Sequence, residues 1–585
     1  MQTCIVGGGP GGLQVASLLR AASQPVVLFE RASNVGAFFA HYPVGRELIS
    51  INKRATGRGD SEFALRHDWN SLLGGPLFQS NRYWPHADEL VTYLREFANA
   101  TGLLDGIVKT NHEVVSVRQV GGGGGASHAF ELTVRHHTDD GELSVSVVSC
   151  KRVVWATGFH HRRPASFENK RNVDFYDTFD VNSQQWHNAT ILILGNGNAA
   201  FEIATAVYER AAAVHVVGRR PLRFAWATHY VGDLRHQVMG LLDAYQLKSL
   251  GGIAEIVDAG RLMFLQSNCT GKTYPLPKDY FSTIERADRD CFQRLGFNRD
   301  ADLFSFVSKT SPLSLELMSY GLRSGYDRIV SCLGFTSNKT AFSSMEPSPW
   351  ADETGRFPII GSFFESARVP NLFFAGVLAH GNDYRRSSGG FVHGIRYNAR
   401  ILARFLLLQD AGTEWTHTLL ESSTCTPGGS CSGTATLIAE HMLRRLNSAS
   451  AIYHLFGQVC DFVVVTSSSS AKAIYIEEVP CSVNAPLALV PSFAALGEQA
   501  RVVFTVTFEY GETKDWDPFG ANRVKGDFAH PERSLFLHPV LRAFVDANRT
   551  LIHTQHLAED FLTRFDSSAH RDMTAAFVRQ ALGER

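Results

Sequence analysis

Two short glycine clusters have the spacing of a turn that binds the pyrophosphate of a dinucleotide. In this motif the first glycine permits a tight turn, the second lets the backbone approach the pyrophosphate, and the third lets a helix pack closely on a strand. Glu30 follows Gly12 by 18 residues, where a carboxylate would bind both hydroxyls of an adenosine ribose. We therefore expect a dinucleotide site here. The residues of the first cluster are Gly7, Gly9, Pro10, Gly11 and Gly12.

The second cluster is the variant of this motif that ends in alanine. Its residues are Gly195, Gly197, Asn198 and Ala200. The strand that follows ends in Gly218, Arg219 and Arg220, where the first cluster has its acid. A carboxylate would repel the 2′-phosphate of NADPH, whereas a guanidinium binds it in a fork. We therefore predict that the second site prefers NADPH to NADH, with Arg219 and Arg220 as the phosphate contacts.

Each cluster lies between a short buried strand and an apolar helix, which is the context that this motif requires. The first cluster follows a strand over residues 2–6 and opens a helix over residues 10–22, and a strand over residues 25–29 comes next. The second follows a strand over residues 189–194, opens a helix that runs through Ala206, and precedes a strand over residues 213–217. Strand–helix–strand units of this kind predict parallel sheets.

Two further strands mark where one nucleotide-binding domain interrupts the other. Residues 151–158 end in Ala156, Thr157 and Gly158, and residues 326–334 repeat the pattern with Cys-Leu-Gly. Small residues at these joints let the chain pass close to bound cofactors as it leaves and re-enters the first domain. The two fingerprints lie about 190 residues apart, one at the start of the chain and one inside it. This order predicts an FAD domain interrupted by an NAD(P) domain.

A third segment is expected to complete the FAD site from far along the sequence. A strand over residues 371–376 and a polar, glycine-rich loop over residues 380–390 precede a helix over residues 392–408. The N-terminus of this helix would direct partial positive charge toward the flavin pyrimidine and stabilise reduced, anionic flavin. The remaining residues that we assign to the FAD site are Arg31, Val114, Gly376 and Gly390.

The chain has 585 residues, too many for a single hydrophobic core. We expect an α/β fold with two Rossmann-like dinucleotide-binding domains and an α+β C-terminal region. The FAD domain comprises residues 1–159 and 336–412, the NAD(P)H domain residues 160–335, and a structural or partner-binding appendage residues 413–585. The appendage shows neither a nucleotide fingerprint nor metal-ligand spacing. Its expected elements are a helix over residues 437–446 and strands over residues 461–465, 472–478 and 501–510.

Composition gives no support to several classes of partner. The 56 basic and 57 acidic side chains nearly balance, which offers no argument for a nucleic acid or an anionic membrane surface. No apolar run of about 18 residues predicts a membrane span. We expect neither a secretory signal nor a retrieval signal in the sequence as given. The nine cysteines form no C-x-x-C; Cys425 and Cys431 are expected to be thiols, with a loop disulfide as the alternative.

Taken together, the motifs resemble the two-dinucleotide-binding flavoproteins of the disulfide-reductase and flavin-containing monooxygenase type. Residues 42–54 and 93–98 are similar to the monooxygenase branch. The chain is more similar still to the FAD-dependent oxidoreductase domain-containing family of endoplasmic-reticulum flavoproteins. This resemblance implies an FAD protein of the endoplasmic-reticulum lumen with degradation or disulfide-exchange proteins as partners; because no targeting signal is seen, the cytoplasm is the alternative. The runs that carry it are residues 48–54, 65–73, 226–235, 245–250 and 389–394.

The resemblance leaves the reaction open. Disulfide reductases pass electrons from flavin to a neighbouring dithiol, and without a C-x-x-C we do not expect that chemistry. Monooxygenases react reduced flavin with O₂ in a dry pocket, but residues 167–188 lack the F-x-G-x-x-x-H signature of that branch. We expect an NADPH-dependent FAD oxidoreductase whose acceptor is O₂, a small molecule or a partner protein. The alternatives are a flavin-dependent monooxygenase that oxygenates nitrogen or sulfur and a partner-binding quality-control factor with structural FAD.

Two polar residues are candidates for direct flavin contacts. Asn52 stands where the monooxygenase pattern has an asparagine and would hydrogen-bond the flavin or its oxygen adduct, with a turn asparagine as the alternative. Asp383 is expected to reach the ribityl chain. Reductases have a Gly-Asp pair after this strand, whereas this chain has Gly-Val at residues 376–377, so the acid is missing from its usual place. His160 and His161 are expected to be exposed. Candidates for the NADPH cleft, with core packing as the alternative for Trp226 and Tyr230, are Trp226, His229, Tyr230, Asp233 and Arg235.

Overall fold

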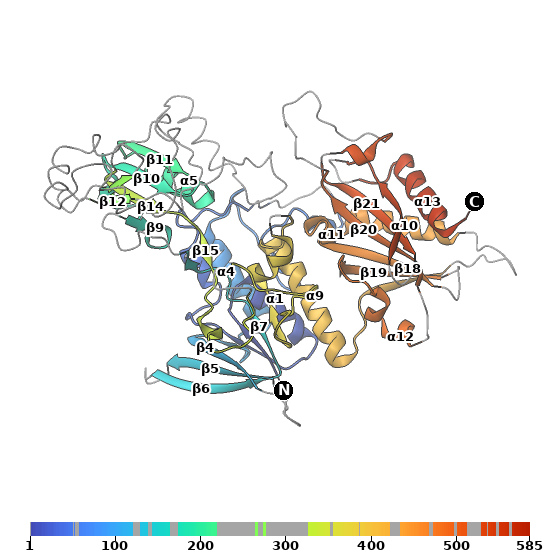
Figure 1. The fold of residues 1–585 in the computed structure, drawn as a ribbon, viewed down its shortest axis with the longest axis horizontal. Helices are drawn as coiled ribbons and strands as arrows, with labels where there is room; N and C mark the ends of the chain where they lie inside the picture. Colours follow the sequence, from blue (N-terminus) through green and yellow to red (C-terminus); the bar gives the residue numbers. More distant parts are fainter. Residues whose placement is uncertain are drawn as a thin grey trace, which may run out of the picture.

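The computed structural model arranges the chain in three parts: two nucleotide-binding domains and a C-terminal antiparallel sheet (Figure 1). The described residues are 2–50, 52, 58–120, 129–137, 143–163, 173–218, 264–266, 273–275, 326–350, 355–384, 386–421, 433–466, 472–495, 500–511, 528–534, 536–545, 549–560 and 564–584. Outside them lie Arg219, Arg220, the candidate cleft residues Trp226, His229, Tyr230, Asp233 and Arg235, and the pair Cys425 and Cys431.

The first domain is built on a five-stranded parallel sheet in the order β16-β7-β1-β2-β3. The strands β1 and β7 are buried along their whole length, as expected of parallel strands that are covered on both faces. Most of their residues are apolar for that reason; the exceptions are Thr3 and Arg152, and the guanidinium of Arg152 is paired with Asp410. The strands are β1 (Thr3–Val6), β2 (Val26–Phe29), β3 (Val108–Lys109), β7 (Arg152–Trp155) and β16 (Leu372–Phe374).

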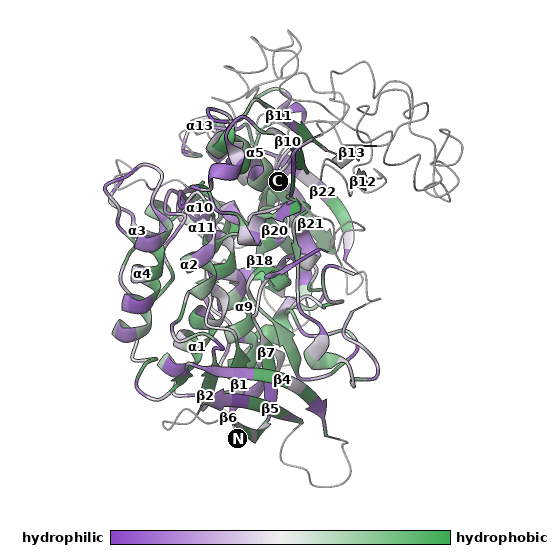
Figure 2. Cartoon of the chain, turned by 90° about the vertical axis from the view of Figure 1, so that its left-hand side faces the viewer, coloured by the Kyte–Doolittle hydropathy of each residue, from purple (hydrophilic) through white to green (hydrophobic). Residues whose placement is uncertain are grey.

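The two faces of this sheet have different covers. Ile5 belongs to a hydrophobic cluster with the helices α1, α4 and α9, whereas Cys4 and Val6 belong to a second cluster with strands β4 and β5. This alternation is the two-residue period of a strand. In Figure 2, α4 shows alternating green and purple bands that reflect its one buried side. The other elements of this domain are α1 (Pro10–Ala21), α2 (Ala37–His41), α3 (Ser61–Ala64), α4 (Ala87–Ala100), α9 (Val392–Ala411), β4 (His112–Gln119), β5 (Phe130–His137) and β6 (Leu143–Cys150).

The second domain repeats the parallel architecture with four strands in the order β11-β10-β14-β9. The chain enters and leaves this domain through β8 and β15, which pair antiparallel, so the two joints run side by side. An insertion of the second domain into the first is therefore confirmed. The elements are β8 (His161–Arg162), β9 (Val173–Phe175), β10 (Thr190–Leu194), α5 (Asn198–Val207), β11 (Ala213–Val217), β12 (Phe264–Gln266), β13 (Thr273–Pro275), β14 (Arg328–Ser331) and β15 (Phe335–Thr336).

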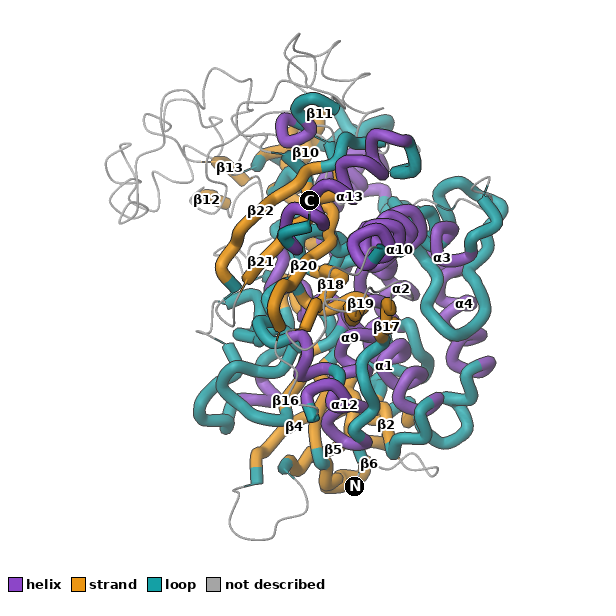
Figure 3. Tube along the Cα trace, turned by 90° about the vertical axis from the view of Figure 1, so that its right-hand side faces the viewer, coloured by secondary structure: helices purple, strands orange, loops and turns teal. Residues whose placement is uncertain are grey.

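The C-terminal region is a six-stranded antiparallel sheet in the order β17-β19-β18-β20-β21-β22, with helices α10 and α13 lying across it (Figure 3). One hydrophobic cluster runs from α1 and α9 of the first domain into this sheet. Arg404 of α9 donates a hydrogen bond of 3.0 Å to Glu478 of β19, which adds a buried charge pair to that contact. The elements are β17 (His417–Glu421), α10 (Thr434–Ser448), α11 (Ser450–His454), β18 (Val459–Thr466), β19 (Lys472–Pro480), α12 (Pro491–Ala494), β20 (Ala500–Glu509), β21 (His538–Val545), β22 (Thr550–His556) and α13 (Ser568–Leu582).

Among the described residues, two disulfides join segments that no sequence pattern connects. Cys4 of β1 is bonded to Cys150 at the end of β6, and Cys460 of β18 is bonded to Cys481 just after β19. Within the described ranges, no helix combines the length and the apolarity needed to cross a bilayer.

Candidate functional site

A cavity of about 1290 Å³ opens at the carboxyl ends of the parallel strands of the first domain. It is larger than the roughly 300–1,000 Å³ of most small-molecule sites, as a dinucleotide requires. Twelve of the residues assigned to FAD line it together, although they come from six separate stretches of sequence. They are Gly7, Gly9, Pro10, Gly11, Glu30, Arg31, Val114, Ala156, Thr157, Gly158, Gly376 and Gly390.

The glycine turn is packed tightly against the protein at Gly7 and Gly12 and is open toward the cavity at Gly9. Gly7 has a φ of +108°, and a Cβ there would lie 2.7 Å from the carbonyl oxygen of Ala156. A Cβ on Gly12 would lie 2.0 Å from the carbonyl oxygen of Gly7, so Gly12 serves helix packing and does not line the cavity. A Cβ on Gly9 would meet no atom within 4 Å. The turn thus fits a pyrophosphate at Gly9, next to the N-terminus of α1.

Glu30 is fixed at the end of β2 by two backbone amides. Its Oε2 accepts a hydrogen bond of 2.6 Å from Gly8 and its Oε1 accepts one of 2.8 Å from Ala32. A carboxylate has about four acceptor sites, so both oxygens retain capacity for ribose hydroxyls. Beside it the rings of His112 and His136 stack with centroids 4.6 Å apart and line the same end of the cavity.

The structure does not support the role predicted for Asn52. Its amide nitrogen donates to the backbone carbonyls of Ser80, at 2.7 Å, and Arg82, at 3.3 Å. Asn52 is absent from the cavity wall, so it is the turn asparagine that was the alternative. Three asparagines do line the cavity: Asn70, Asn111 and Asn338. Asn70 is the buried one, and sequence reasoning missed it because a buried polar residue has no periodic signature.

Asp383 is also placed differently from the prediction. It is 3% exposed and does not line the cavity. One carboxylate oxygen lies 2.8 Å from Nδ1 of His380, and the other accepts a hydrogen bond from Ser387. A Cβ on Gly390 would lie 2.8 Å from Cδ2 of His380. Asp383 therefore stabilises the turn next to Gly390, and both of its carboxylate oxygens are engaged by protein groups.

The two histidines after the first joint differ from each other. His161 is exposed, as expected, whereas His160 is half-buried and lines the cavity. Burial lowers the pKa of His160 to about 4, and the charges of Arg31 and His161 act in the same direction. His160 therefore presents a neutral imidazole to the cavity at neutral pH.

The segment over residues 65–71 forms the cavity wall that faces the N-terminus of α9. The Trp69 ring stacks on His393 with centroids 4.8 Å apart, and both residues line the cavity. Arg396 of α9 holds the segment by donating to the carbonyls of Ser71, at 3.0 Å, and Leu65, at 2.6 Å. The wall is thus fixed to the helix whose N-terminus faces the cavity.

The C-terminal region supports this wall from behind. Arg66 is 2% exposed, and its guanidinium donates to the carbonyls of Leu446, at 2.7 Å, and Ala449, at 2.8 Å, at the end of α10. Nε2 of His454 in α11 lies 3.3 Å from the carbonyl oxygen of Leu65. Burial lowers the pKa of Arg66 to about 10. The segment is therefore held between the first domain and the C-terminal sheet.

The second glycine turn has the same backbone geometry as the first. Gly195 has a φ of +109°, and a Cβ there would lie 2.4 Å from the carbonyl oxygen of Cys332 in the second joint. A Cβ on Gly197 would meet no atom within 4 Å, while Ala200 is buried in the helix packing. Asn198 is the first residue of α5. The predicted phosphate contacts Arg219 and Arg220 lie outside the described residues.

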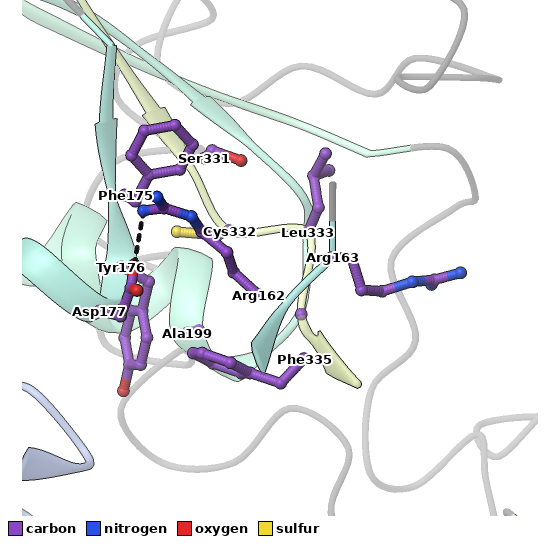
Figure 4. Close-up of a pocket in the computed structure, with 11 residues that line it drawn as sticks. Arg162, Arg163, Phe175, Tyr176, Asp177, Ala199, Ser331, Cys332, Leu333 and Phe335 are labelled. Atoms are coloured by element: carbon purple, nitrogen blue, oxygen red, sulfur yellow. Dashed lines mark hydrogen bonds and ion pairs between the residues drawn. The ribbon is translucent and has the colours of Figure 1, made fainter. Parts of the chain in front are cut away.

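A small pocket lies between the second joint and the start of α5 (Figure 4). Arg162 lies across it, with its guanidinium 4.0 Å from the centre of the Phe175 ring and 3.4 Å from Asp177. The pocket has space for about 10 Å³, which is room for about one water molecule. As it stands it is too small for a nicotinamide.

Hydrogen bonds at Glu202 and Tyr176 help to tie the second domain to the first. Glu202 of α5 accepts hydrogen bonds from the hydroxyl of Tyr176, at 2.7 Å, and from the backbone amide of Gly45 in the first domain. The Tyr176 hydroxyl in turn accepts one of 3.1 Å from the amide of Val44. Burial raises the pKa of Glu202 above its usual value, although these hydrogen bonds oppose the shift. The cavity also includes Gly334 and Phe335 from the second joint, so both domains contribute to it.

Comparison with known proteins decides the family. Residues 4–303 match the family described as pyridine nucleotide-disulphide oxidoreductase. FAD-dependent oxidoreductase domain-containing protein 2 of Danio rerio is 31% identical, covering 99% of this chain and 83% of its own length. The chain belongs to the FAD-dependent oxidoreductase domain-containing family. The member of this family from Mus musculus is 32% identical, covering 96% of this chain and 80% of its own length. Membership implies a flavin cofactor and confirms the predicted family and fold class.

Two solved structures of other proteins align with about 70% of this chain. Bacillithiol disulfide reductase of Bacillus cereus aligns over 70% of this chain and 100% of its own, with a TM-score of 0.46 and 15% identity. A flavin monooxygenase mutant of Stenotrophomonas maltophilia aligns over 70% of this chain and 99% of its own, also with a TM-score of 0.46 and 15% identity.

Proposed function

We propose that this protein is an NADPH-dependent FAD oxidoreductase that binds FAD in the large cavity and NADPH at the second glycine turn. The observation that carries the proposal is the shared cavity wall: Gly9 of the first turn and Phe335 of the second joint line one cavity. Nucleotides held at the two turns could therefore meet within it. FAD bound there would accept a hydride, which is two electrons and a proton, from NADPH and pass two electrons to an acceptor.

The residues present suit these two cofactors. Gly9 and Gly197 leave open space at the N-termini of α1 and α5, where an anionic pyrophosphate is stabilised by the helix dipole and free amides. Glu30 retains acceptor capacity for a ribose. The pair Arg219 and Arg220, which follow Gly218 in the sequence, is our proposed contact for the 2′-phosphate.

The composition of the wall bears on the electron acceptor. None of the described residues that line the cavity is a cysteine, and a disulfide acceptor must lie next to the flavin to be reduced directly. We therefore propose an acceptor that comes from outside: O₂, a small molecule or a partner protein. Aromatic side chains such as Trp69, Phe159 and Phe391 line the cavity, which favours a monooxygenase as the second candidate because oxygen transfer needs a dry site.

We also propose that the protein works in the lumen of the endoplasmic reticulum, with degradation or disulfide-exchange proteins as partners. The two disulfides support an oxidising compartment. Thiol alkylation of protein from intact cells, followed by peptide mapping, tests this. Protection of Cys4, Cys150, Cys460 and Cys481 is expected, whereas four alkylated thiols would favour the cytoplasm.

The reaction itself is tested by mixing the purified holoprotein with NADPH without oxygen and following the flavin absorbance. Rapid bleaching is expected, faster with NADPH than with NADH. Bound FAD that stays oxidised would contradict the proposal and favour a quality-control factor with structural FAD. On admission of air, stoichiometric H₂O₂ release would identify an oxidase-like reaction, whereas oxygen incorporated into an added amine or thioether would identify a monooxygenase.

A further inference from the structure

The side chain of Asn70 lies in the cavity wall with its amide NH₂ group unused. It is 2% exposed and lines the cavity. Its Oδ1 accepts a hydrogen bond of 2.6 Å from the Ser50 hydroxyl, and its backbone amide donates one of 3.0 Å to Asp68. The buried Nδ2 has no hydrogen-bond partner among the residues that the structure describes. Native proteins pair nearly all buried donors, so this amide points to a ligand.

The surroundings of Asn70 fix it in one place. Ser50 orients the carboxamide from its oxygen side, which leaves the NH₂ group as the end that is available. On one side Trp69 is stacked on His393, and on the other Ser71 is held through its carbonyl by Arg396. Because these two partners belong to the first turns of α9, Asn70 lies at the end of the cavity that faces the N-terminus of this helix.

The chemistry at this end favours an acceptor atom with negative charge. A helix N-terminus carries partial positive charge, and it acts only over its first turn. The unpaired NH₂ of Asn70 is a donor, so both groups would stabilise a carbonyl oxygen whose charge becomes more negative on reduction. The pyrimidine half of a flavin ring carries such carbonyl oxygens.

We propose that Asn70 is a flavin-binding residue whose Nδ2 donates a hydrogen bond to a pyrimidine carbonyl oxygen of FAD. The inference rests on the proposed function, because that proposal places FAD in this cavity. Asn70 then assists reduction by stabilising negative charge on the ring, while the aromatic pair beside it excludes water. Asn52 has no such role because its amide is already bonded to two backbone carbonyls.

Two variants and a matched control test the proposal in the full-length protein. Asn70→Leu removes the donor, and Asn70→Asp keeps the shape but replaces the NH₂ with a carboxylate oxygen. Each is expected to weaken FAD affinity about 3- to 10-fold, the value of one hydrogen bond. The midpoint potential of bound flavin should become more negative in both, and more so for Asp. Asn99→Asp, the same change at an exposed position of α4 outside the cavity, is the control and should change neither quantity.

Thermal unfolding separates a binding role from a structural one. Without FAD, Asn70→Leu removes a donor that has no partner together with the single hydrogen bond from Ser50, so the apoprotein should unfold close to the wild-type temperature. With saturating FAD, the variant should unfold at a lower temperature than wild type. An equal loss in both forms would overturn the proposal, as would wild-type FAD affinity and potential in both variants. If Asn70→Leu does not fold, Asn70→Asp decides. A wild-type protein that binds no FAD would instead contradict the proposed function.

Discussion

The first and second nucleotide sites share one backbone device and differ in what surrounds it. Gly7 and Gly195 have φ values of +108° and +109°, and each is pressed against a carbonyl of its own joint, Ala156 or Cys332. Gly9 and Gly197 both face open space. The turn therefore specifies a dinucleotide, and it cannot specify which one.

The difference begins at the end of the second strand of each unit. The first site has the carboxylate of Glu30, clamped by two amides. The second has Gly218, where a Cβ would lie 2.1 Å from the side chain of Asn196. A side chain at Gly218 would displace that of Asn196, and we propose that the residues that follow Gly218 distinguish NADPH from NADH. In this proposal the residues at the end of the second strand select the ligand, and the turn binds its pyrophosphate.

The largest effect is expected from Gly9→Leu. Gly9 has a φ of −81°, so a side chain causes no backbone strain and points into the space of the pyrophosphate. FAD affinity should fall at least about 100-fold, measured from flavin retained after desalting and by titration of the apoprotein. A fully loaded yellow variant would refute the assignment of the first site.

Gly197→Leu makes the same change at the second site, where φ is −92°. If the two turns bind different nucleotides, this variant keeps its FAD but is no longer reduced by NADPH. Anaerobic stopped-flow absorbance should show a loss of at least about 100-fold in the apparent affinity for NADPH. Loss of FAD from this variant would contradict the assignment of different nucleotides to the two turns.

A smaller and more selective effect is expected from replacing both Arg219 and Arg220 with alanine. Charge-assisted hydrogen bonds contribute about 1.5–3 kcal/mol, so the preference for NADPH over NADH should fall about 10- to 100-fold. Reduction rates with the two nucleotides measure the ratio. The FAD content serves as the control. An unchanged ratio of the NADPH and NADH rates would show that these arginines do not bind the 2′-phosphate.

The smallest effect concerns the contact between the two domains. Burial raises the pKa of Glu202, so its contribution to stability is complete below the usual carboxyl pKa and declines as pH rises through the raised value. Glu202→Gln should therefore lower the unfolding temperature more at pH 4.5 than at pH 7.5. Glu209→Gln alters an exposed carboxylate just beyond the same helix and should show no such dependence. The opposite trend for Glu202→Gln would contradict the sign.

Both turns could be predicted from sequence because neighbouring residues determine their geometry. Gly7 and Gly195 are recognisable by spacing alone, and the second joint was located by its likeness to the first. Asn70 was not predictable in the same way, because its placement depends on Ser50 and on α9, more than 300 residues away. For the same reason the prediction for Asn52 was wrong: a motif position gives the residue type, but only the folded chain shows that Ser80 and Arg82 already occupy its amide.

With FAD bound in the cavity as we propose, Arg66 couples flavin binding to the folding of the C-terminal sheet. The guanidinium joins the end of α10 to the segment that carries Trp69 and Asn70. By thermodynamic linkage, a ligand at 100 times its Kd adds about 2.7 kcal/mol to the stability of whatever must be folded to bind it. The C-terminal sheet is among the parts that must be folded for FAD to bind if unfolding of the sheet loosens the cavity wall. A partner that pulled the sheet away would then release flavin, and fading of the yellow protein would record the event.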